Sequence, residues 1–260
     1  MILSILAYHM VDPRFDWGAT RVTPGQFEKQ IQYALKRGFS FYTLSDYIEK
    51  NRFNDEKALV ITFDDGYKSI IQYAFPILQK YNIRATVFII AGYIGQYNTW
   101  DVNIGWLRFE HLNWPDIAML DEAGWEVGSH TLNHHDLTLL SSNDLADELL
   151  LSKMILETKL RKKIASISFP FGNANQTTIR LCQQTGYRFA VVMGNRIPGV
   201  PYQFTLDRLG VYLFDSQLSF GHKISGRHLK LYRFIQRILD LCSNGSVIVK
   251  YGFNSKLTKK

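Results

Sequence analysis

The sequence predicts an α/β fold, a distorted (β/α) barrel of about seven strands in a single domain. Short apolar, β-branched runs alternate along the chain with stretches whose apolar residues recur at helical spacing, which indicates repeated strand–helix units. The length of 260 residues suits one barrel, and neither an internal repeat nor a second domain stands out. We expect residues 1–222 to form the barrel, and residues 223–260 to add a basic amphipathic helix, a strand and a tail packed on it.

The composition is that of a globular protein with an excess of positive charge. Hydrophobic residues make up 46% and charged residues 20% of the chain, and the formal net charge is +7. This charge favours an anionic surface or polymer in a general way. Because no basic block carries a recognisable nucleic-acid motif, we expect no nucleic-acid partner. Two cysteines, Cys182 and Cys242, are too few for a disulfide framework.

The chain opens with a short strand. Residues 1–9, MILSILAYH, lack the basic start and the longer apolar run of a signal peptide. No stretch approaches the ~18 apolar residues of a membrane span, so we expect a protein in the cytoplasm or at a membrane surface. A helix capped by Thr23 and opened by Pro24 follows. A strand at Phe39–Leu44 and a short helix at Ser45–Lys50 come next.

The stretch Leu59–Gly66, LVITFDDG, is the centre of the sequence. Its first five residues are apolar or β-branched and predict a strand buried on both faces, which Gly66 ends. Asp64 and Asp65 therefore lie at the carboxyl end of a core strand, where α/β proteins carry their chemistry. Two adjacent carboxylates need a compensating cation, a shared proton or open solvent. A solvated turn that carries two acids is the alternative.

The chain between the two central motifs contains further barrel elements and one insertion. A helix with an expected kink at Pro76 leads to a buried strand at Ala85–Ile90. The insertion, Gly92–Asn113, is rich in glycine, asparagine and tryptophan and includes Trp100. A helix at Asp116–Ala123 completes this part.

A pair of histidines follows the next strand. The short strand Trp125–Gly128 leads into Ser129-His130-Thr131-Leu132-Asn133-His134. Two histidines four residues apart on a helical turn would present both imidazoles to one ion. Two imidazoles and one carboxylate are a common ligand set for a catalytic zinc-like ion, with one position left open for water.

A long amphipathic helix separates the histidines from the last strands. It begins near Ser141, and its apolar stripe is predicted to comprise Leu145, Leu149, Met154, Ile155 and Leu160. The elements expected after it are a strand at Ile164–Phe169, the turn Pro170-Phe171-Gly172-Asn173, a helix at Gln176–Thr185, a strand at Phe189–Met193 and the run LDRLGV, which contains Arg208.

The tail has a different pattern, with basic and apolar residues on opposite sides of a predicted helix. The apolar side comprises Leu231, Phe234, Ile235, Ile238 and Leu239, and the basic side comprises Arg227, Lys230, Arg233 and Arg237. Such a helix can lie on an anionic membrane, so a membrane-surface contact through residues 227–239 is one interpretation. The other is a helix that closes the barrel and has a solvated outer face.

The two central motifs resemble those of the polysaccharide deacetylase family, the NodB homology domain of carbohydrate esterase family 4. Thr62-Phe63-Asp64-Asp65-Gly66 is similar to TFDDG, and His130-Thr131-Leu132-Asn133-His134 is similar to H-[ST]-x-x-H. The resemblance covers the chain from about Ile5 to Gly210. It implies a metal-dependent hydrolase that removes N-acetyl groups from amino sugars of an N-acetylglucosamine-type polysaccharide or oligosaccharide and releases acetate.

The resemblance also implies roles for individual residues. Asp65, His130 and His134 would hold a divalent metal, most simply zinc, with cobalt or nickel as alternatives. Asp64 would act as general base. The turn Pro170-Phe171-Gly172 resembles the family's R-x-P-[YF]-G motif, and the backbone N–H of Phe171 would bind the oxyanion, with Pro170 and Gly172 in support. The aromatic insertion, including Trp100, could stack on sugar rings or could pack onto the barrel.

Two departures from the family pattern concern the general acid and the arginine. The strand expected at Ser246–Tyr251 lacks the histidine that most members carry there. The opening strand, however, resembles the I-L-x-Y-H strand of a permuted branch, which makes His9 the candidate acid; an ordinary strand-end histidine is the alternative. Ser168 stands where the third motif usually has arginine. Arg208 could replace that arginine electrostatically, or it could be a plain structural residue.

Two rival functions fit parts of the pattern. A catalytically impaired carbohydrate-binding protein on the same fold would account for Ser168 and for the absence of a late histidine. A metal-dependent glycosyltransferase would use Asp64 and Asp65 to hold a nucleotide-bound ion, but it would leave His130 and His134 without a role.

Overall fold

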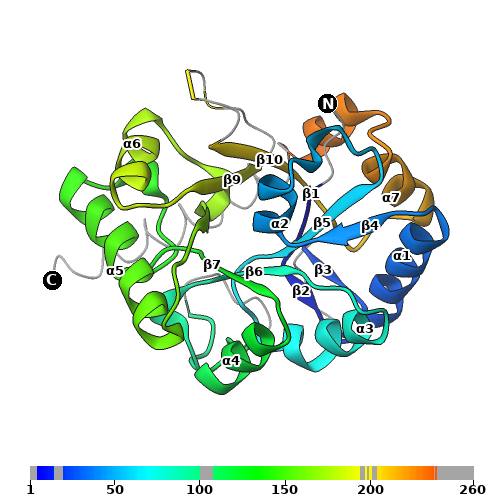
Figure 1. The fold of residues 1–260 in the computed structure, drawn as a ribbon, viewed down its shortest axis with the longest axis horizontal. Helices are drawn as coiled ribbons and strands as arrows, with labels where there is room; N and C mark the ends of the chain where they lie inside the picture. Colours follow the sequence, from blue (N-terminus) through cyan, green and yellow to red (C-terminus); the bar gives the residue numbers. More distant parts are fainter. Residues whose placement is uncertain are drawn as a thin grey trace, which may run out of the picture.

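The computed structural model describes residues 5–14, 20–99, 108–193, 197, 199–200, 204–236 and 238. In these residues the chain forms a closed barrel of seven parallel strands surrounded by helices (Figure 1), which confirms the predicted (β/α) barrel. None of the helices in the described part is long and apolar enough to cross a membrane.

The strands follow one another around the barrel in nearly sequential order. Neighbouring strands pair in parallel, and β1 pairs with both β10 and β5, which closes the ring. In order around the ring they are β5 (Ala58–Phe63), β6 (Thr86–Ile89), β7 (Glu126–Ser129), β8 (Ser166–Ser168), β9 (Phe189–Met193), β10 (Thr205–Gly210) and β1 (Ile5–Tyr8). An eighth strand, β4 (Ser40–Tyr42), pairs with the first half of β5, and β2 (Met10–Val11) pairs with β3 (Arg21–Val22) in a separate small sheet.

The position of strand β5 in the barrel explains why its sequence is a continuous apolar run. All six of its residues are buried, because the barrel interior lies on one side and the surrounding helices lie on the other. Its last residue, Phe63, stacks on Trp125 at 5.6 Å and also contacts the rings of Tyr8 and Phe27. This aromatic cluster fixes the end of the strand that leads directly into Asp64.

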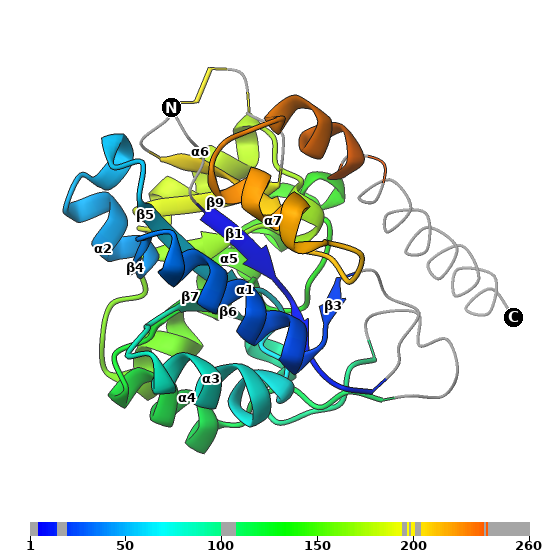
Figure 2. The ribbon, with the colours of Figure 1, turned by 90° about the vertical axis from the view of Figure 1, so that its right-hand side faces the viewer.

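Helices connect successive strands and cover the outside of the barrel (Figures 1 and 2). Side-chain caps define several of their starts. Thr23 accepts from the backbone of Gln26, as predicted, and Asn113 and Asp116 form a reciprocal capping box. The helices are α1 (Pro24–Lys36), α2 (Leu44–Glu49), α3 (Phe75–Lys80), α4 (Trp114–Glu122), α5 (Ser142–Leu160), α6 (Gln176–Gln184) and α7 (Gln217–Ile224).

The predicted kink near Pro76 corresponds to a change of helix type. A π-helix at Ile70–Ala74 precedes α3, and the backbone N–H of Phe75 donates to the carbonyl of Ile70. Proline has no N–H to continue the regular ladder, and the wider turn lies immediately before it.

The predicted apolar stripe of α5 is wrong at Met154 and Ile155, whereas Leu160 packs against the core. Met154 and Ile155 are exposed, and the buried line passes instead through Glu148, Ser152 and Leu156. The error has a physical cause, because Glu148 and Ser152 bury polar groups that find hydrogen-bond partners inside. A prediction based on apolar residues alone therefore assigned the buried side of the helix to the wrong residues.

The last described elements lie beside the first helix. Helix α7 packs on α1 (Figure 2), where the rings of Phe220 and Tyr33 lie 6.3 Å apart. The chain is helical again over residues 229–236. The boundary expected between residues 222 and 223 falls within α7 and stays a prediction, and the strand expected at Ser246–Tyr251 lies outside the described residues.

Candidate active site and metal centre

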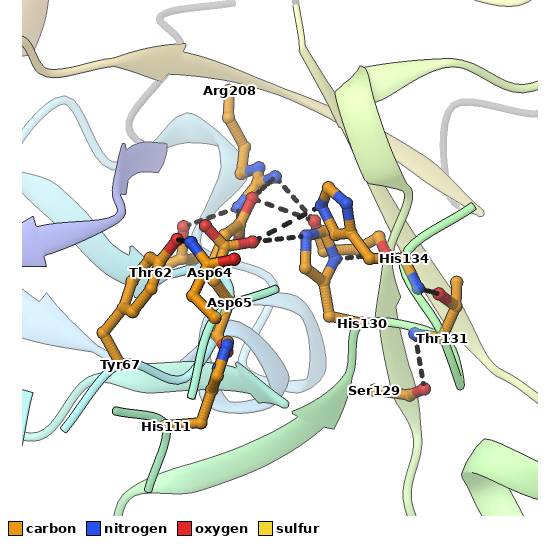
Figure 3. Close-up of polar contacts among 12 residues, drawn as sticks. Thr62, Asp64, Asp65, Tyr67, His111, Ser129, His130, Thr131, His134 and Arg208 are labelled. Carbon is orange, nitrogen blue, oxygen red and sulfur yellow. Dashed lines mark hydrogen bonds and ion pairs between the residues drawn. The ribbon is translucent and has the colours of Figure 1, made fainter. Parts of the chain in front are cut away.

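The carboxyl ends of the barrel strands bring the candidate residues together. In the register of the sheet, Tyr8 lies opposite Phe63, and Ile89 lies opposite Ser129. The residues that follow these strand ends, His9, Asp64 and His130, therefore emerge on one face of the barrel. Figure 3 shows Asp64, Asp65, His130, His134 and Arg208 converging there.

Three buried side chains form a candidate metal centre. Oδ1 of Asp65 lies 3.3 Å from Nε2 of His130 and 3.4 Å from Nε2 of His134. The ligand atoms of the three residues lie within 4.8 Å of one another. Oδ1 of Asp65 has no hydrogen-bond donor among the described residues although it is buried. Such an oxygen, facing two imidazoles, suits a divalent cation.

The tautomer of His130 strengthens this assignment. Its Nδ1 lies 2.8 Å from the carbonyl oxygen of Ser168, so this nitrogen carries the hydrogen and donates it. Burial lowers the pKa of His130, but the carboxylates of Asp65 and Asp64 outweigh this and raise it. When the ring is neutral, Nε2 presents a lone pair toward the carboxylate of Asp65. Two acceptors at this distance require a proton or a cation between them.

Burial and neighbouring charge set the protonation of the ligands. Burial, with the added effect of His130, lowers the pKa of His134 to about 3, so this imidazole is neutral at physiological pH. Burial raises the pKa of Asp65, but His130, His134 and His9 together hold it below its usual value. A neutral imidazole and an ionised carboxylate are the forms that bind metal.

The two histidines do not lie on a helical turn, which corrects the geometry expected from their spacing. They belong to an irregular loop in which Thr131 and His134 both have left-handed backbones, with φ of 67° and 60°. Asp65 has φ of 66° as well. Backbone strain of this kind concentrates at functional sites, where surrounding structure holds it in place.

Glu148 of α5 holds the histidine loop from one side. Its Oε2 accepts from the backbone N–H groups of Leu132 and Asn133, both at 2.9 Å, and its Oε1 accepts from the side chain of Asn133 at 2.8 Å. Oε1 also lies 3.1 Å from Nδ1 of His135. Sequence reasoning missed this residue. The available signal was a carboxylate within the apolar face of α5.

On its other side the loop rests against the end of β6. The backbone N–H of Gly92 donates to the carbonyl of Leu132 at 2.8 Å. A Cβ at position 92 would lie only 2.6 Å from that oxygen, so glycine is required for the close approach. The loop between the two imidazoles is thus fixed by contacts on both sides.

Arg208 lies directly against Asp64. Its Nη1 and Nη2 donate to the two carboxylate oxygens, both at 2.7 Å, and its side chain is 0% exposed. Ser168 lies in the same cluster, donating to Asp64 at 3.1 Å and accepting from Arg208 at 2.8 Å. Burial raises the pKa of Asp64, but Arg208 and His130 outweigh this and hold it well below its ordinary value.

His9 and the turn at Phe171 lie at the edges of the cluster. Nδ1 of His9 is buried without a hydrogen-bond partner in the described part of the chain. Phe171 has φ of 58°, and its ring packs on His134 at 4.8 Å. Pro170 and Gly172 are buried beside it. Trp100 lies outside the described residues.

His111 is a further residue that sequence reasoning missed. Its Nδ1 lies 2.8 Å from the backbone carbonyl of Asp65, and its ring stacks on Tyr67 at 5.0 Å (Figure 3). Burial lowers the pKa of His111, so the ring is neutral and donates to that carbonyl. A single buried histidine in an irregular insertion gave no pattern from which this contact could be predicted.

A cleft of about 410 Å³ opens at Tyr67, whose ring stacks on His111, and none of the candidate metal ligands lines it. It lies between the segment that follows Asp65 and the described part of the insertion, and its wall combines aromatic rings with basic side chains. The residues that line it are Arg14, Tyr67, Lys68, Ser69, Gln72, Tyr73, Tyr97, Arg108, Phe109 and Glu110.

The barrel and its cluster define an α/β protein with a candidate metal centre of two imidazoles and one carboxylate. The chain belongs to the polysaccharide deacetylase family, whose sequence profile matches residues 51–190. This match confirms the resemblance drawn from the TFDDG and HTLNH motifs.

Individual relatives agree with the family. The chain is 28% identical over 192 residues to YxkH of Bacillus subtilis, provisionally named a polysaccharide deacetylase, across 73% of this chain and 63% of YxkH. It is 28% identical over 183 residues to the poly-beta-1,6-N-acetyl-D-glucosamine N-deacetylase of Staphylococcus aureus, across 65% of this chain and 59% of that protein. The chain thus spans less than two thirds of the length of either relative.

A solved structure shares the fold. The deacetylase PplD of Streptococcus pyogenes, determined in complex with acetate, superposes with a TM-score of 0.73 at 23% identity. The superposition covers 86% of this chain and 98% of PplD, so the barrel architecture matches over nearly the whole of that structure.

Proposed function

We propose that this chain is a metal-dependent hydrolase that removes N-acetyl groups from amino sugars of an N-acetylglucosamine-type polysaccharide or oligosaccharide and releases acetate. One observation carries the proposal. Three buried ligands, Asp65, His130 and His134, converge beside a second carboxylate, Asp64, that is ionised and is not one of the three. The kinship with a poly-N-acetylglucosamine N-deacetylase supports the same chemistry and the same class of substrate.

The ligand set fits a divalent metal, most simply zinc, with cobalt or nickel as alternatives. Asp65, His130 and His134 would hold it, and Ser168 would fix the ring of His130 through its carbonyl oxygen. When bound, the ion polarises the amide carbonyl and lowers the pKa of a bound water toward ~7.

The remaining residues of the site transfer protons and stabilise the charge that develops on the carbonyl oxygen. Asp64 takes a proton from the attacking water, and Arg208 and Ser168 keep its carboxylate oriented for this step. The backbone N–H of Phe171 binds the negative oxygen that develops on the carbonyl. His9 gives a proton to the departing amine, so the products are acetate and a free amino sugar.

The cleft at Tyr67 would hold the rest of the glycan. Tyr97 is 49% exposed on its wall and Tyr73 adds further aromatic surface, whereas Phe109 is buried beneath the guanidinium of Arg14. Flat aromatic rings stack on the apolar faces of sugars, and Arg14 and Arg108 supply donors for hydroxyl groups. Trp100, in the same insertion, stays a predicted sugar-stacking residue.

Acetate release from N-acetylglucosamine oligomers with added Zn²⁺ or Co²⁺ tests the function. Asp64→Asn should lower turnover by about 10²- to 10⁴-fold while metal still binds, because it removes only the base. Asp65→Ala and His134→Ala should lose the metal itself. Asp147→Asn, on the exposed side of α5, is the control and should behave as wild type.

Two results would contradict the proposal. Full activity in Asp64→Asn would show that another group is the base. Binding of the oligomer by the wild type with no acetate release at any added metal would favour the catalytically impaired carbohydrate-binding protein.

A further inference from the structure

The helix over residues 229–236 presents apolar side chains to solvent. Leu231 is 53% exposed, Phe234 is 61% exposed, and Ile238, just beyond, is 46% exposed. Spacings of three and four residues place these side chains on one side of a helix. A surface helix ordinarily has the opposite arrangement, with its apolar side inward.

The other side of this helix is anchored to the barrel, which fixes its orientation. Gln236 is buried and accepts from the backbone N–H of Gly210 at 2.9 Å. The hydroxyl of Tyr232 lies 3.2 Å from Nδ1 of His222. Arg233 forms an ion pair with Asp207 of β10 at 2.9 Å. The helix thus packs on the barrel, and its solvent-exposed outer side carries apolar side chains.

The charge around this exposed side has one sign. No aspartate or glutamate occurs between Asp215 and Asp240. Arg227 and Lys230 are exposed next to the apolar side chains, whereas Lys223 and Arg233 are paired with aspartates. We call Leu231, Phe234 and Ile238, together with Arg227 and Lys230, the tail face.

We propose that the tail face docks on an anionic lipid bilayer, with the helix lying along the membrane surface. The three apolar side chains enter the interface between headgroups and acyl chains, and the two basic side chains contact anionic headgroups. This inference goes beyond the proposed function and does not depend on it, because none of the tail-face residues touches the metal cluster.

A second copy of the chain is a poorer occupant. A two-fold interface would place each basic patch against its own copy, where like charges repel. Three apolar side chains, each about half exposed, also supply much less than the roughly 800 Å² per partner of a stable interface. An anionic bilayer satisfies both the apolar and the basic parts of the face.

Vesicle co-sedimentation of the whole chain tests the proposal. Vesicles of phosphatidylcholine and phosphatidylglycerol in equal parts should bind the protein, and vesicles of phosphatidylcholine alone should bind it less. Binding should weaken as salt is added. Phe234→Ser should lower the partition coefficient by roughly tenfold, because it removes a large apolar side chain from the interface. Lys230→Glu should weaken binding to the anionic vesicles only.

Leu139→Ser is the matched control. Leu139 is also an exposed leucine, but it lies outside the tail face, so its substitution should leave vesicle binding unchanged. Phe234→Ser and Leu139→Ser should both release acetate from soluble oligomers at the wild-type rate. Equal binding by wild type and Phe234→Ser would overturn the proposal. The proposal would also be overturned if the wild type were a dimer by light scattering and Phe234→Ser were a monomer, because the tail face would then bind a second copy of the chain.

Discussion

Asp64 shows how one residue is supported when its usual partner is replaced. Ser168 occupies the place of the expected arginine on β8, and the guanidinium reaches Asp64 from Arg208 on β10 instead. Strand β9 lies between these two strands, yet both side chains meet the same carboxylate at the centre of the barrel. Ser168 is small enough to leave room for the guanidinium and polar enough to bond to it.

Replacing Arg208 should change the pH dependence of turnover. Arg208 lowers the pKa of Asp64, so Arg208→Lys, which loses the two parallel hydrogen bonds, should raise that pKa. Asp64 acts as a base only when ionised, and a higher pKa therefore moves the acid limb of the kcat/KM profile to higher pH. Near neutral pH Asp64 stays ionised in both proteins, so any loss of activity there reflects the lost orientation of its carboxylate rather than its protonation.

The pH profile of acetate release by wild type and Arg208→Lys measures this effect. Arg233→Lys is the control, because Arg233 pairs with Asp207 at a partly exposed position away from the cluster. An acid limb at the same pH in all three proteins would mean that Arg208 does not set the protonation of Asp64.

At the scale of elements, the strands were predictable because burial dictates their composition. The predicted strand Phe189–Met193 matches β9, and the apolar run that ends at Phe63 matches the end of β5. Both are buried along their whole length, so their sequences carry a strong apolar signal. Loops carry no such signal, and the loop of His130 and His134 was expected to be helical from spacing alone.

The histidine loop depends on contacts that spacing cannot show. Leu132 and Asn133, which lie between its left-handed residues, are held by Glu148 from α5 and by Gly92, just after β6. Both partners are distant in the sequence. The ligand residues could therefore be identified by motif, whereas the geometry that positions them could not.

Glu148→Ala should weaken metal binding without touching a ligand. The substitution removes the acceptor of two backbone N–H groups between the two imidazoles, so the loop loses its fixed conformation. Loss of such supporting contacts typically lowers metal affinity by about 10- to 100-fold. Competition with a chromophoric chelator measures the metal dissociation constant directly.

Asp147→Ala is the matched control for Glu148→Ala, because it removes the neighbouring carboxylate on the exposed side of the same helix. Turnover of Glu148→Ala should recover in part at saturating metal, which a general loss of folding would not allow. Equal dissociation constants for both variants would show that the loop holds its shape without Glu148.

The insertion should contribute to substrate affinity rather than to the chemical step. Tyr97 lies on the wall of the cleft and touches none of the cluster residues, so Tyr97→Ala should raise KM by about tenfold with kcat nearly unchanged. Tyr97→Phe keeps the ring and should retain a near wild-type KM. A fall in kcat with constant KM would place Tyr97 in the reaction instead of the binding surface.

At the scale of the whole molecule, barrel closure decides which residues meet. Strand β1 lies between β5 and β10, with Leu6 paired to both Ile61 and Leu209. This arrangement brings His9, Asp64 and Arg208 from three distant parts of the chain to one face. Periodicity in a sequence identifies a strand but does not name its neighbours, so the contact between Arg208 and Asp64 remained one of two alternatives until the strands were placed.

Metal binding should stabilise the entire barrel, because the ligands come from two different strand ends. A ligand that binds only the folded state at about 100 times its dissociation constant adds about 2.7 kcal/mol to the free energy of unfolding. For a chain of this size that corresponds to a rise in Tm of about 5–10 °C.

Thermal unfolding of the protein with Zn²⁺ and with a chelator should show this difference. His134→Ala should lose it, while Asp64→Asn, which keeps all three ligands, should retain it. An equal Tm with metal and with chelator in the wild type would exclude the cluster as a metal site.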